Sequence, residues 1–292
     1  MTLACRYDTL PGHGVSWYHE TMPGITYEDG PAHITPAAFH AYLAAQRGMA
    51  PEDLCVAPLV VGTFQRRIWQ HLWDRTDAVP DPTAPYGWDV DAMARGSVDG
   101  RDVSVVRLPI GAPAAVTWME EFIVAGARRF IFAGTAGSLQ PSLPIGSLAL
   151  ATSAVREEGT SYHYLPPDVV PYASPSLVTA LRTAGEARGR ELRAGPLWTT
   201  DAVYRETSAK VARYAAQGVL GVEMEAAALF AVAMARQVDA ALIVAMSDEL
   251  FHPWTPGFHH DALLAGMREA AEIALDAATC NGAVDECPPT AP

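Results

Sequence analysis

Short apolar runs alternate along most of the chain with longer segments whose apolar residues recur at helical spacing. The short runs predict buried strands at residues 54–61, 103–108, 129–133, 147–152, 191–198, 219–222 and 239–247. The longer segments predict helices at residues 64–73, 113–126, 175–188, 206–217, 224–236 and 259–278, and one more that begins at Thr35-Pro36. This alternation predicts an α/β fold, a single domain whose central mixed β-sheet is flanked by helices on both faces.

The segments without periodicity lie mainly at the two ends of the chain. Residues 1–34 are rich in glycine, proline, histidine and aromatic residues, and we expect an irregular N-terminal arm. Residues 280–292 end in Cys-Pro-Pro-Thr-Ala-Pro, and we expect a disordered tail. Residues 76–98 contain several prolines and are predicted to form a surface excursion. The predicted domain therefore spans residues 35–279.

The charge balance argues against nucleic acid as a partner. The chain has 20 Lys and Arg against 33 Asp and Glu, a net charge of −13, whereas a nucleic-acid surface needs a basic stripe. No apolar run approaches the roughly 18 residues of a membrane span, and the N-terminus has no signal-peptide pattern. The 4 cysteines show neither metal-binding spacing nor a disulfide framework. We therefore expect a cytoplasmic protein with free thiols, no bound metal and a small-molecule ligand.

Two carboxylates stand where an apolar strand meets an apolar helix. The stretch from Gly218 to Ala233 reads Gly-Val-Leu-Gly-Val-Glu-Met-Glu-Ala-Ala-Ala-Leu-Phe-Ala-Val-Ala, with Glu223 and Glu225 at the junction. Acids near a helix start often do no more than complement the helix dipole. Here the neighbours are too apolar for a solvated helix end, and an ionised carboxylate among apolar residues is costly without partners. We therefore interpret the junction as a buried ligand site.

The segment Val222-Glu-Met-Glu-Ala-Ala227 resembles the signature of the nucleoside phosphorylase/nucleosidase superfamily. The resemblance runs from about Val103 to Glu249. It implies an α/β domain that forms a homo-oligomer (dimer, trimer or hexamer), with Glu225 gripping the ribose hydroxyls and Met224 packing on the sugar. It also implies that a histidine from a neighbouring subunit reaches the sugar, for which the N-terminal candidates are His13, His19 and His33.

Departures from the family pattern concern the acceptor of the sugar. Ile131-Phe-Ala-Gly-Thr-Ala-Gly-Ser138 places small residues after a strand, where Thr135 and Gly137 let a ligand approach. In the family this strand ends in an arginine that holds phosphate together with the hydroxyl. Thr135 matches the hydroxyl, but Phe132 replaces the arginine, and the family's Gly-Asp-Pro-x-Arg loop has no counterpart. Because phosphate is poorly held without a cation, water becomes an alternative acceptor, with Glu223 as the catalytic carboxylate that positions it.

Further segments supply candidates for the base side. A strand ending in Ser-Asp places Asp248 at the sheet edge, where α/β folds bind ligands. In the purine-acting branch of the family the matching Asp protonates the base, so Asp248 is the candidate general acid. Tyr204 is kept from a family segment whose base-stacking Phe is replaced here by Val203. The loop after residue 153 offers Tyr162 and His163 as substrate contacts, and for each of them a structural role is an equal alternative.

The sequence thus predicts an enzyme that cleaves, or reversibly forms, the N-glycosidic bond of a nucleoside. No metal or organic cofactor is implied. Phosphate (as co-substrate) and water both stay open as acceptors. For phosphate, Arg66, Arg67 or an arginine of a neighbouring subunit would have to supply the missing positive charge. The alternative is a repurposed enzyme or a non-catalytic nucleoside- or metabolite-binding protein on the same fold. The retained Glu225 and Asp248 favour the enzyme, since a pure scaffold would need neither.

Overall fold

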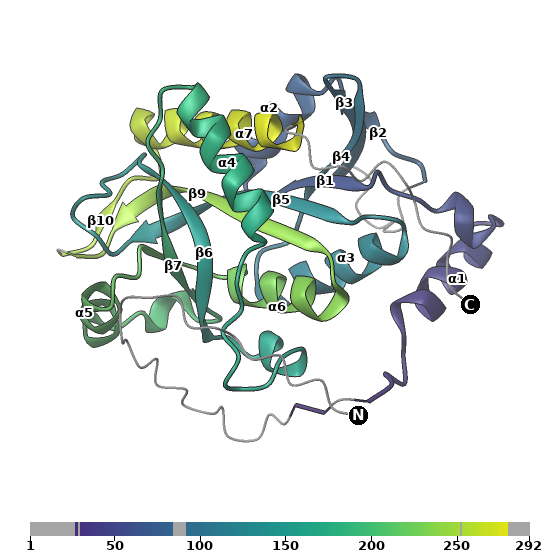
Figure 1. The fold of residues 1–292 in the computed structure, drawn as a ribbon, viewed down its shortest axis with the longest axis horizontal. Helices are drawn as coiled ribbons and strands as arrows, with labels where there is room; N and C mark the ends of the chain where they lie inside the picture. The colour runs from purple at the N-terminus through teal and green to yellow at the C-terminus, as the bar shows by residue number, and fades with distance from the viewer. Residues whose placement is uncertain (1–26, 29, 84–91, 252, 280–292) are drawn as a thin grey trace.

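The computed structural model describes residues 27–28, 30–83, 92–251 and 253–279, and Figure 1 shows their arrangement. The described helices are α1 (Pro36–Gln46), α2 (Arg66–Arg75), α3 (Ala112–Val124), α4 (Pro175–Ala187), α5 (Ser208–Ala216), α6 (Ala226–Arg236) and α7 (Asp261–Thr279). The described strands are β1 (Leu59–Thr63), β2 (Val79–Pro80), β3 (Met93–Val98), β4 (Arg101–Arg107), β5 (Arg129–Ser138), β6 (Leu148–Glu157), β7 (Arg193–Thr200), β8 (Gly221–Glu223), β9 (Asp239–Glu249) and β10 (Thr255–Pro256).

All of these strands belong to one mixed sheet, in the order β10-β9-β6-β7-β8-β5-β1-β4-β3-β2. β9 also pairs with β5, so that five strands (β5, β9, β6, β7 and β8) close into a ring. β1 and β4 continue the sheet from β5 in parallel. Because β4, β1, β5 and β9 are mutually parallel, their carboxyl ends meet at one edge, where α/β sheets bind ligands.

Helices cover both faces of the sheet, as the sequence pattern predicts. α7 contacts β5 and β9 and packs on α2 and α4, whereas α3 packs on α6. Figure 1 shows these two groups of helices on opposite sides of the strands. The predicted α/β class, with a central mixed sheet between helices, is therefore confirmed. None of the described helices is long and apolar enough to cross a membrane.

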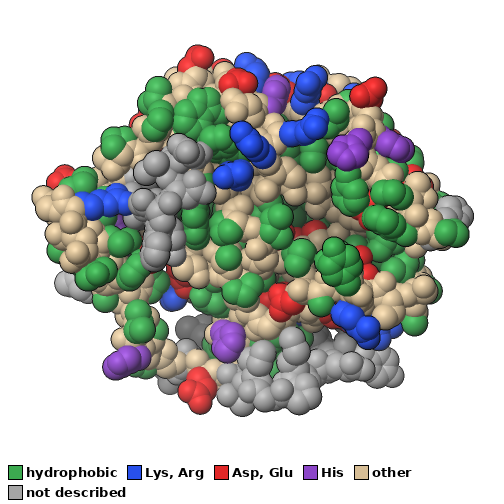
Figure 2. All heavy atoms as spheres, turned by 180° about the vertical axis from the view of Figure 1, so that it is seen from behind, with side chains coloured by type: hydrophobic (Ala, Val, Ile, Leu, Met, Phe, Trp, Pro, Cys, Tyr) green, Lys and Arg blue, Asp and Glu red, His purple; other side chains and the backbone are tan. Residues whose placement is uncertain are grey.

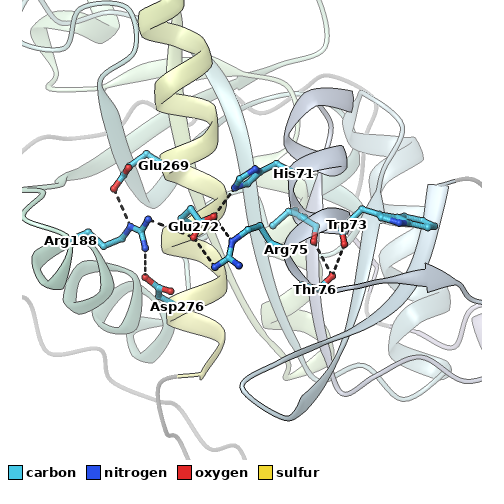
Figure 3. Close-up of polar contacts among 9 residues, drawn as sticks. His71, Trp73, Arg75, Thr76, Arg188, Glu269, Glu272 and Asp276 are labelled. Carbon is cyan, nitrogen blue, oxygen red and sulfur yellow. Dashed lines mark hydrogen bonds and ion pairs between the residues drawn. The ribbon is translucent and has the colours of Figure 1, made fainter.

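The helices of the α7 face are joined by an ion-pair network (Figure 3). Glu272 of α7 bonds to Arg75 Nε and His71 Nε2 of α2, each at 2.7 Å. Arg188, which follows α4, reaches Asp276 at 2.9 Å. Figure 2 shows Lys and Arg side chains gathered on the upper part of the face seen from behind, with acidic side chains beside them. Opposite charges are thus interspersed there, with no uniform basic field.

The prediction of a plain surface excursion for residues 76–98 is wrong at its end. Met93–Val98 forms β3 and pairs antiparallel with β4. The connecting residues, Asp99 and Gly100, both have positive φ, as a two-residue hairpin turn requires. β3 therefore extends the sheet beyond β4, and β2 pairs antiparallel with β3. Residues 84–91 lie outside the described part of the chain.

Strand boundaries also differ from the prediction around the glycine-rich segment. β5 runs on to Ser138 and includes both glycines, neither of which has positive φ. Their lack of a side chain serves close packing instead, because a Cβ on Gly137 would lie 2.5 Å from Leu250 Cδ1. β6 likewise extends into the predicted loop as far as Glu157, and β1 begins only at Leu59.

The predictions for the two chain ends fall largely outside the described residues. Residues 1–26 and 280–292 are among those not described, so the irregular arm and the disordered tail stay predictions. The helix predicted to begin at Thr35-Pro36 lies within the described residues. Thr35 Oγ1 accepts a hydrogen bond from Ala38 N at 3.1 Å and caps α1, which begins at Pro36 as predicted.

Candidate functional site

The sheet register brings the predicted site residues of three strands together. Gly137 of β5 lies opposite Val222 of β8 on one side and Asp248 of β9 on the other. A Cβ on Gly137 would lie only 3.3 Å from Asp248 Oδ1, so the missing side chain lets this carboxylate approach the β5 backbone. Thr199 of β7 in turn lies opposite Glu223 of β8. Residues distant in sequence thus converge at one end of the closed ring.

Glu223 is buried and fully engaged with the protein. Its Oε1 accepts a hydrogen bond from Thr199 Oγ1 at 2.5 Å. Its Oε2 accepts from the backbone N–H groups of Glu225 at 2.8 Å and Ala226 at 2.7 Å. Burial raises the pKa of Glu223, and these hydrogen bonds oppose that rise. The side chain therefore caps the start of α6, whose first N–H groups need acceptors.

Glu225 is the N-cap residue of α6, and its side chain is 5% exposed. Its Oε1 accepts the N–H of Gly111 at 2.6 Å, so the carboxylate joins the start of α6 to the start of α3. Gly111 has φ of +102°, a conformation in which other residues are strained. Burial, and then the charge of Glu223, raises the pKa of Glu225. Between the two acids, Met224 is partly exposed.

Asp248 carries a contact that the sequence analysis did not predict. Its Oδ1 accepts from Ser247 Oγ at 2.7 Å, and its Oδ2 accepts from Trp254 Nε1 at 2.8 Å. Trp254 precedes β10, which pairs antiparallel with β9 next to Asp248. Burial and the charge of Asp248 raise the pKa of Glu206 to about 7, so a second acid adjoins this one. Trp254 and Glu206 follow no motif, which is why the sequence did not reveal them.

Thr135 lies where the sequence predicts that the acceptor of the sugar binds, and its neighbour there is a glutamine that the sequence did not reveal. Gln65, between β1 and α2, donates from Nε2 to Thr135 Oγ1 at 3.0 Å. Phe132 is fully buried and stacks on Phe64 with ring centroids 6.3 Å apart. The position of the family's arginine is thus filled by an aromatic ring inside the core. The signal that could have found Gln65 is its position just beyond a buried parallel strand.

The remaining predicted contacts, Tyr162, His163 and Tyr204, make no hydrogen bond to Glu223, Glu225 or Asp248 in the described part of the chain. Tyr162 is buried, donates to Arg156 O at 3.2 Å and is covered by the Arg156 guanidinium, 3.9 Å from the ring centroid. His163 is exposed and lines a cavity of about 810 Å³ whose lining residues include none of the acids above. Tyr204 is 97% exposed. Among the residues that the structure describes, no three His, Cys, Asp or Glu side chains lie together as metal ligands would.

Comparisons with known proteins show which protein family the chain resembles. The family model of the phosphorylase superfamily matches residues 76–279. A guanosine phosphorylase of Halorubrum lacusprofundi is 31% identical, over 64% of this chain and 80% of that protein. A purine nucleoside phosphorylase of Bacillus cereus is 31% identical, over 63% of this chain and 78% of that protein.

A solved structure agrees with these relatives. Uridine phosphorylase from Vibrio fischeri superposes with a TM-score of 0.68 at 25% identity, covering 77% of this chain and 93% of that one. The matched part of the chain contains β5, β8 and β9, and with them the buried acids at the end of the ring. The chain therefore belongs to the phosphorylase superfamily, the family that its Glu-Met-Glu segment resembles.

Proposed function

We propose that this enzyme cleaves the N-glycosidic bond of a nucleoside by phosphorolysis. One observation carries the proposal: Glu225 is buried at the start of two helices, at the same edge of the sheet as Asp248 and Thr135. Similar proteins named guanosine, purine nucleoside and uridine phosphorylase support the same reaction. Each of the three side chains would have one role in the reaction. Glu225 would bind the sugar, Asp248 would donate a proton to the base, and the Thr135 hydroxyl would bind the phosphate.

Glu225 and Met224 would bind the ribose. The Gly111 N–H already holds one carboxylate oxygen of Glu225 at 2.6 Å, which fixes the rotamer before substrate arrives. A carboxylate accepts hydrogen bonds from two neighbouring hydroxyl groups, and such charge-assisted bonds are the strong ones. Met224 is partly exposed and adds an apolar, adaptable surface for the sugar.

Asp248 would act on the base. As the C1′–N bond breaks, its electron pair leaves with the base, and the base nitrogen takes the proton of the Asp248 carboxyl. Positive charge then develops on the sugar, a phosphate oxygen bonds to C1′, and the products are free base and a sugar 1-phosphate. The indole N–H of Trp254 and the hydroxyl of Ser247 hold the carboxyl in place. Orientation of this kind makes proton transfer efficient.

We assign Glu223 a positioning role. Three hydrogen bonds from protein donors occupy its two oxygens, which argues against a second task as the base that activates water. Its own bond to the Glu225 N–H aligns the residue that grips the ribose. Tyr204 and His163 are exposed and would contact substrate only at the rim of the site, whereas Tyr162 is buried and would contact it from below the surface. Gly137 would keep room for the base beside Asp248.

The proposal extends to the cellular location, the oligomeric state and the co-substrate of the enzyme. We propose that it works in the cytoplasm as a homo-oligomer, with no metal or organic cofactor, and that phosphate is its only co-substrate. The cysteines, which show no spacing typical of a disulfide framework, support the location. Light scattering of the purified full chain would test the assembly, and a mass equal to one chain would contradict it.

The test of the reaction is base release from a panel of purine and pyrimidine nucleosides, in phosphate-free buffer and with added phosphate. We expect release that requires phosphate and yields sugar 1-phosphate. Equal release without phosphate would identify a hydrolase and overturn the proposed acceptor. Binding without any release would favour a nucleoside-binding protein and overturn the proposed reaction.

A further inference from the structure

Two buried polar atoms, one at the N-cap of α2 and one in its first turn, lack hydrogen-bond partners within the described part of the chain. They are Gln65 Oε1 and Trp69 Nε1. The backbone bond from Trp69 N to Gln65 O, 3.0 Å long, places the two residues one helical turn apart, and side chains at this spacing share a helix face. A buried polar group without a partner is costly, so each such atom in a native structure calls for an explanation. A ligand that bonds to both atoms supplies one.

A cation lies beside these two atoms. The Arg107 guanidinium carbon is 5.7 Å from the centroid of the Trp69 ring. Arg107 ends β4 and lies opposite Thr63 of β1, which itself lies opposite Ala133 of β5. Side chains at matched positions of parallel strands project from the same face, and those of a strand alternate, so Arg107 shares its face with Thr135. Arg107 thus approaches the acceptor side from the strand next to β1.

Two contacts and one helical turn connect the four side chains. Thr135 is hydrogen-bonded to Gln65, Gln65 lies one turn from Trp69, and Trp69 lies under Arg107. Their chemistry is complementary to one kind of ion. The guanidinium, the indole N–H and the threonine hydroxyl donate hydrogen bonds, whereas Gln65 Oε1 accepts one. Hydrogen phosphate has acceptor oxygens for the donors and an O–H for the amide oxygen, whereas sulfate at neutral pH has no proton to donate.

We propose that Gln65, Trp69, Arg107 and Thr135 form the phosphate subsite of this enzyme. Arg107 supplies the positive charge that is missing at Phe132, whose ring is buried in the core. The subsite deepens the proposed phosphorolysis and depends on it. Arg66 and Arg67, the arginines nearest in sequence to Gln65, are exposed and contribute no ligand.

The test separates the binding of phosphate from the binding of nucleoside. Arg107→Met, Trp69→Phe and the control Arg67→Met are compared with the wild-type enzyme by steady-state kinetics, with each substrate varied in turn. Arg107→Met removes the charge, and Trp69→Phe removes the N–H while keeping a ring. We expect the KM for phosphate to rise at least about tenfold in Arg107→Met and about threefold in Trp69→Phe. The nucleoside KM should change less than about twofold in all three variants.

Different results overturn different statements. If the wild-type enzyme releases base equally without phosphate, the proposed phosphorolysis fails before any variant is measured. If phosphate is required but Arg107→Met keeps the wild-type KM for phosphate, only the subsite is wrong. A rise confined to Arg67→Met would also overturn it. Arg107→Lys, which keeps the charge, should recover part of the phosphate affinity, and this recovery excludes misfolding as the cause of the loss.

A competition assay addresses Gln65 on its own. For the wild-type enzyme, the inhibition constant of sulfate should be at least about tenfold larger than the KM for phosphate. The reason is that the amide oxygen of Gln65 would face an unprotonated sulfate oxygen. Gln65→Met keeps the length of the side chain and removes this acceptor. The variant should therefore bind phosphate and sulfate with nearly equal strength. Unchanged discrimination in Gln65→Met would show that Gln65 Oε1 does not face the ion.

Discussion

Replacing Glu225 with glutamine should make the folded protein more stable. Burial raises the pKa of Glu225 above its ordinary value of 4.5, so the ionised form is disfavoured in the folded state. The penalty is absent below that ordinary pKa and grows as the pH rises through the folded pKa. Each unit of pKa shift corresponds to about 1.4 kcal/mol. After subtracting the weaker bond from the Gly111 N–H, we expect Glu225→Gln to gain about 1–2 kcal/mol near pH 9 and nothing near pH 4.

The same substitution should remove most of the activity. A neutral amide offers one acceptor oxygen where the carboxylate offers two, and that oxygen is needed by Gly111. The loss of two charge-assisted bonds to ribose hydroxyls, at about 1.5–2 kcal/mol each, lowers kcat/KM by roughly 10² to 10³. Urea unfolding at several pH values and steady-state kinetics measure the two effects. Higher stability combined with lower activity is the signature of a residue kept for function.

Glu223→Gln is the matched control for this prediction. Its amide N–H₂ would face either Thr199, where the hydrogen bond must reverse its direction, or the backbone donors of α6, where bonds are lost. In both cases the bonds lose the charge of the carboxylate. The raised pKa of Glu223 means that removing its charge offsets part of this cost, and we expect a net loss of about 1 kcal/mol in stability at neutral pH. If Glu225→Gln instead lost stability to the same extent as Glu223→Gln, both acids would be structural, and the assignment of Glu225 to ribose would be refuted.

Three further substitutions test other parts of the structure. The pKa of Glu121 is raised to about 7, chiefly by burial, so Glu121→Gln should gain about 1–2 kcal/mol in unfolding free energy near pH 8 and nothing near pH 4; a gain independent of pH would contradict this origin. Trp254→Phe removes the indole N–H from Asp248 and should lower kcat about tenfold in steady-state assays, whereas an unchanged kcat would show that this bond is dispensable. Gly137→Ala would place a Cβ 2.5 Å from Leu250 Cδ1, and urea unfolding should show a loss of about 1–3 kcal/mol, with full stability counting against the close packing.

Most elements of the fold could be predicted because burial imposes periodicity on the sequence. The parallel strands β1, β4, β5 and β9 are apolar on both faces and stand out as continuous runs. β3 was missed because Gly96 and Ser97 interrupt its apolar positions, although the Asp99-Gly100 pair was an available hairpin signal. The predicted end of β5 at residue 133 was too early, because glycine occurs both after strands and inside closely packed strands such as this one.

The candidate site was predictable where its residues are consecutive. Glu223, Met224 and Glu225 form one short segment, and their burial follows from their apolar neighbours. Gln65 and Trp254 were missed because each joins the site through a contact between distant elements, with Thr135 and Asp248 respectively. Such pairs depend on sheet register and strand order, which local periodicity does not determine.

The closed ring of strands has a consequence for how the molecule folds. Residue 129 of β5 pairs with residue 239 of β9, so the ring cannot close until β9 is present. Until then β5 and β6 each present an unpaired edge, and such edges invite pairing between chains. Contacts this far apart in sequence also slow folding, because a long loop must close first. A chain emerging from the ribosome would therefore pass through an aggregation-prone stage, and Asp248 would join the other residues of the candidate site only when β9 closes the ring.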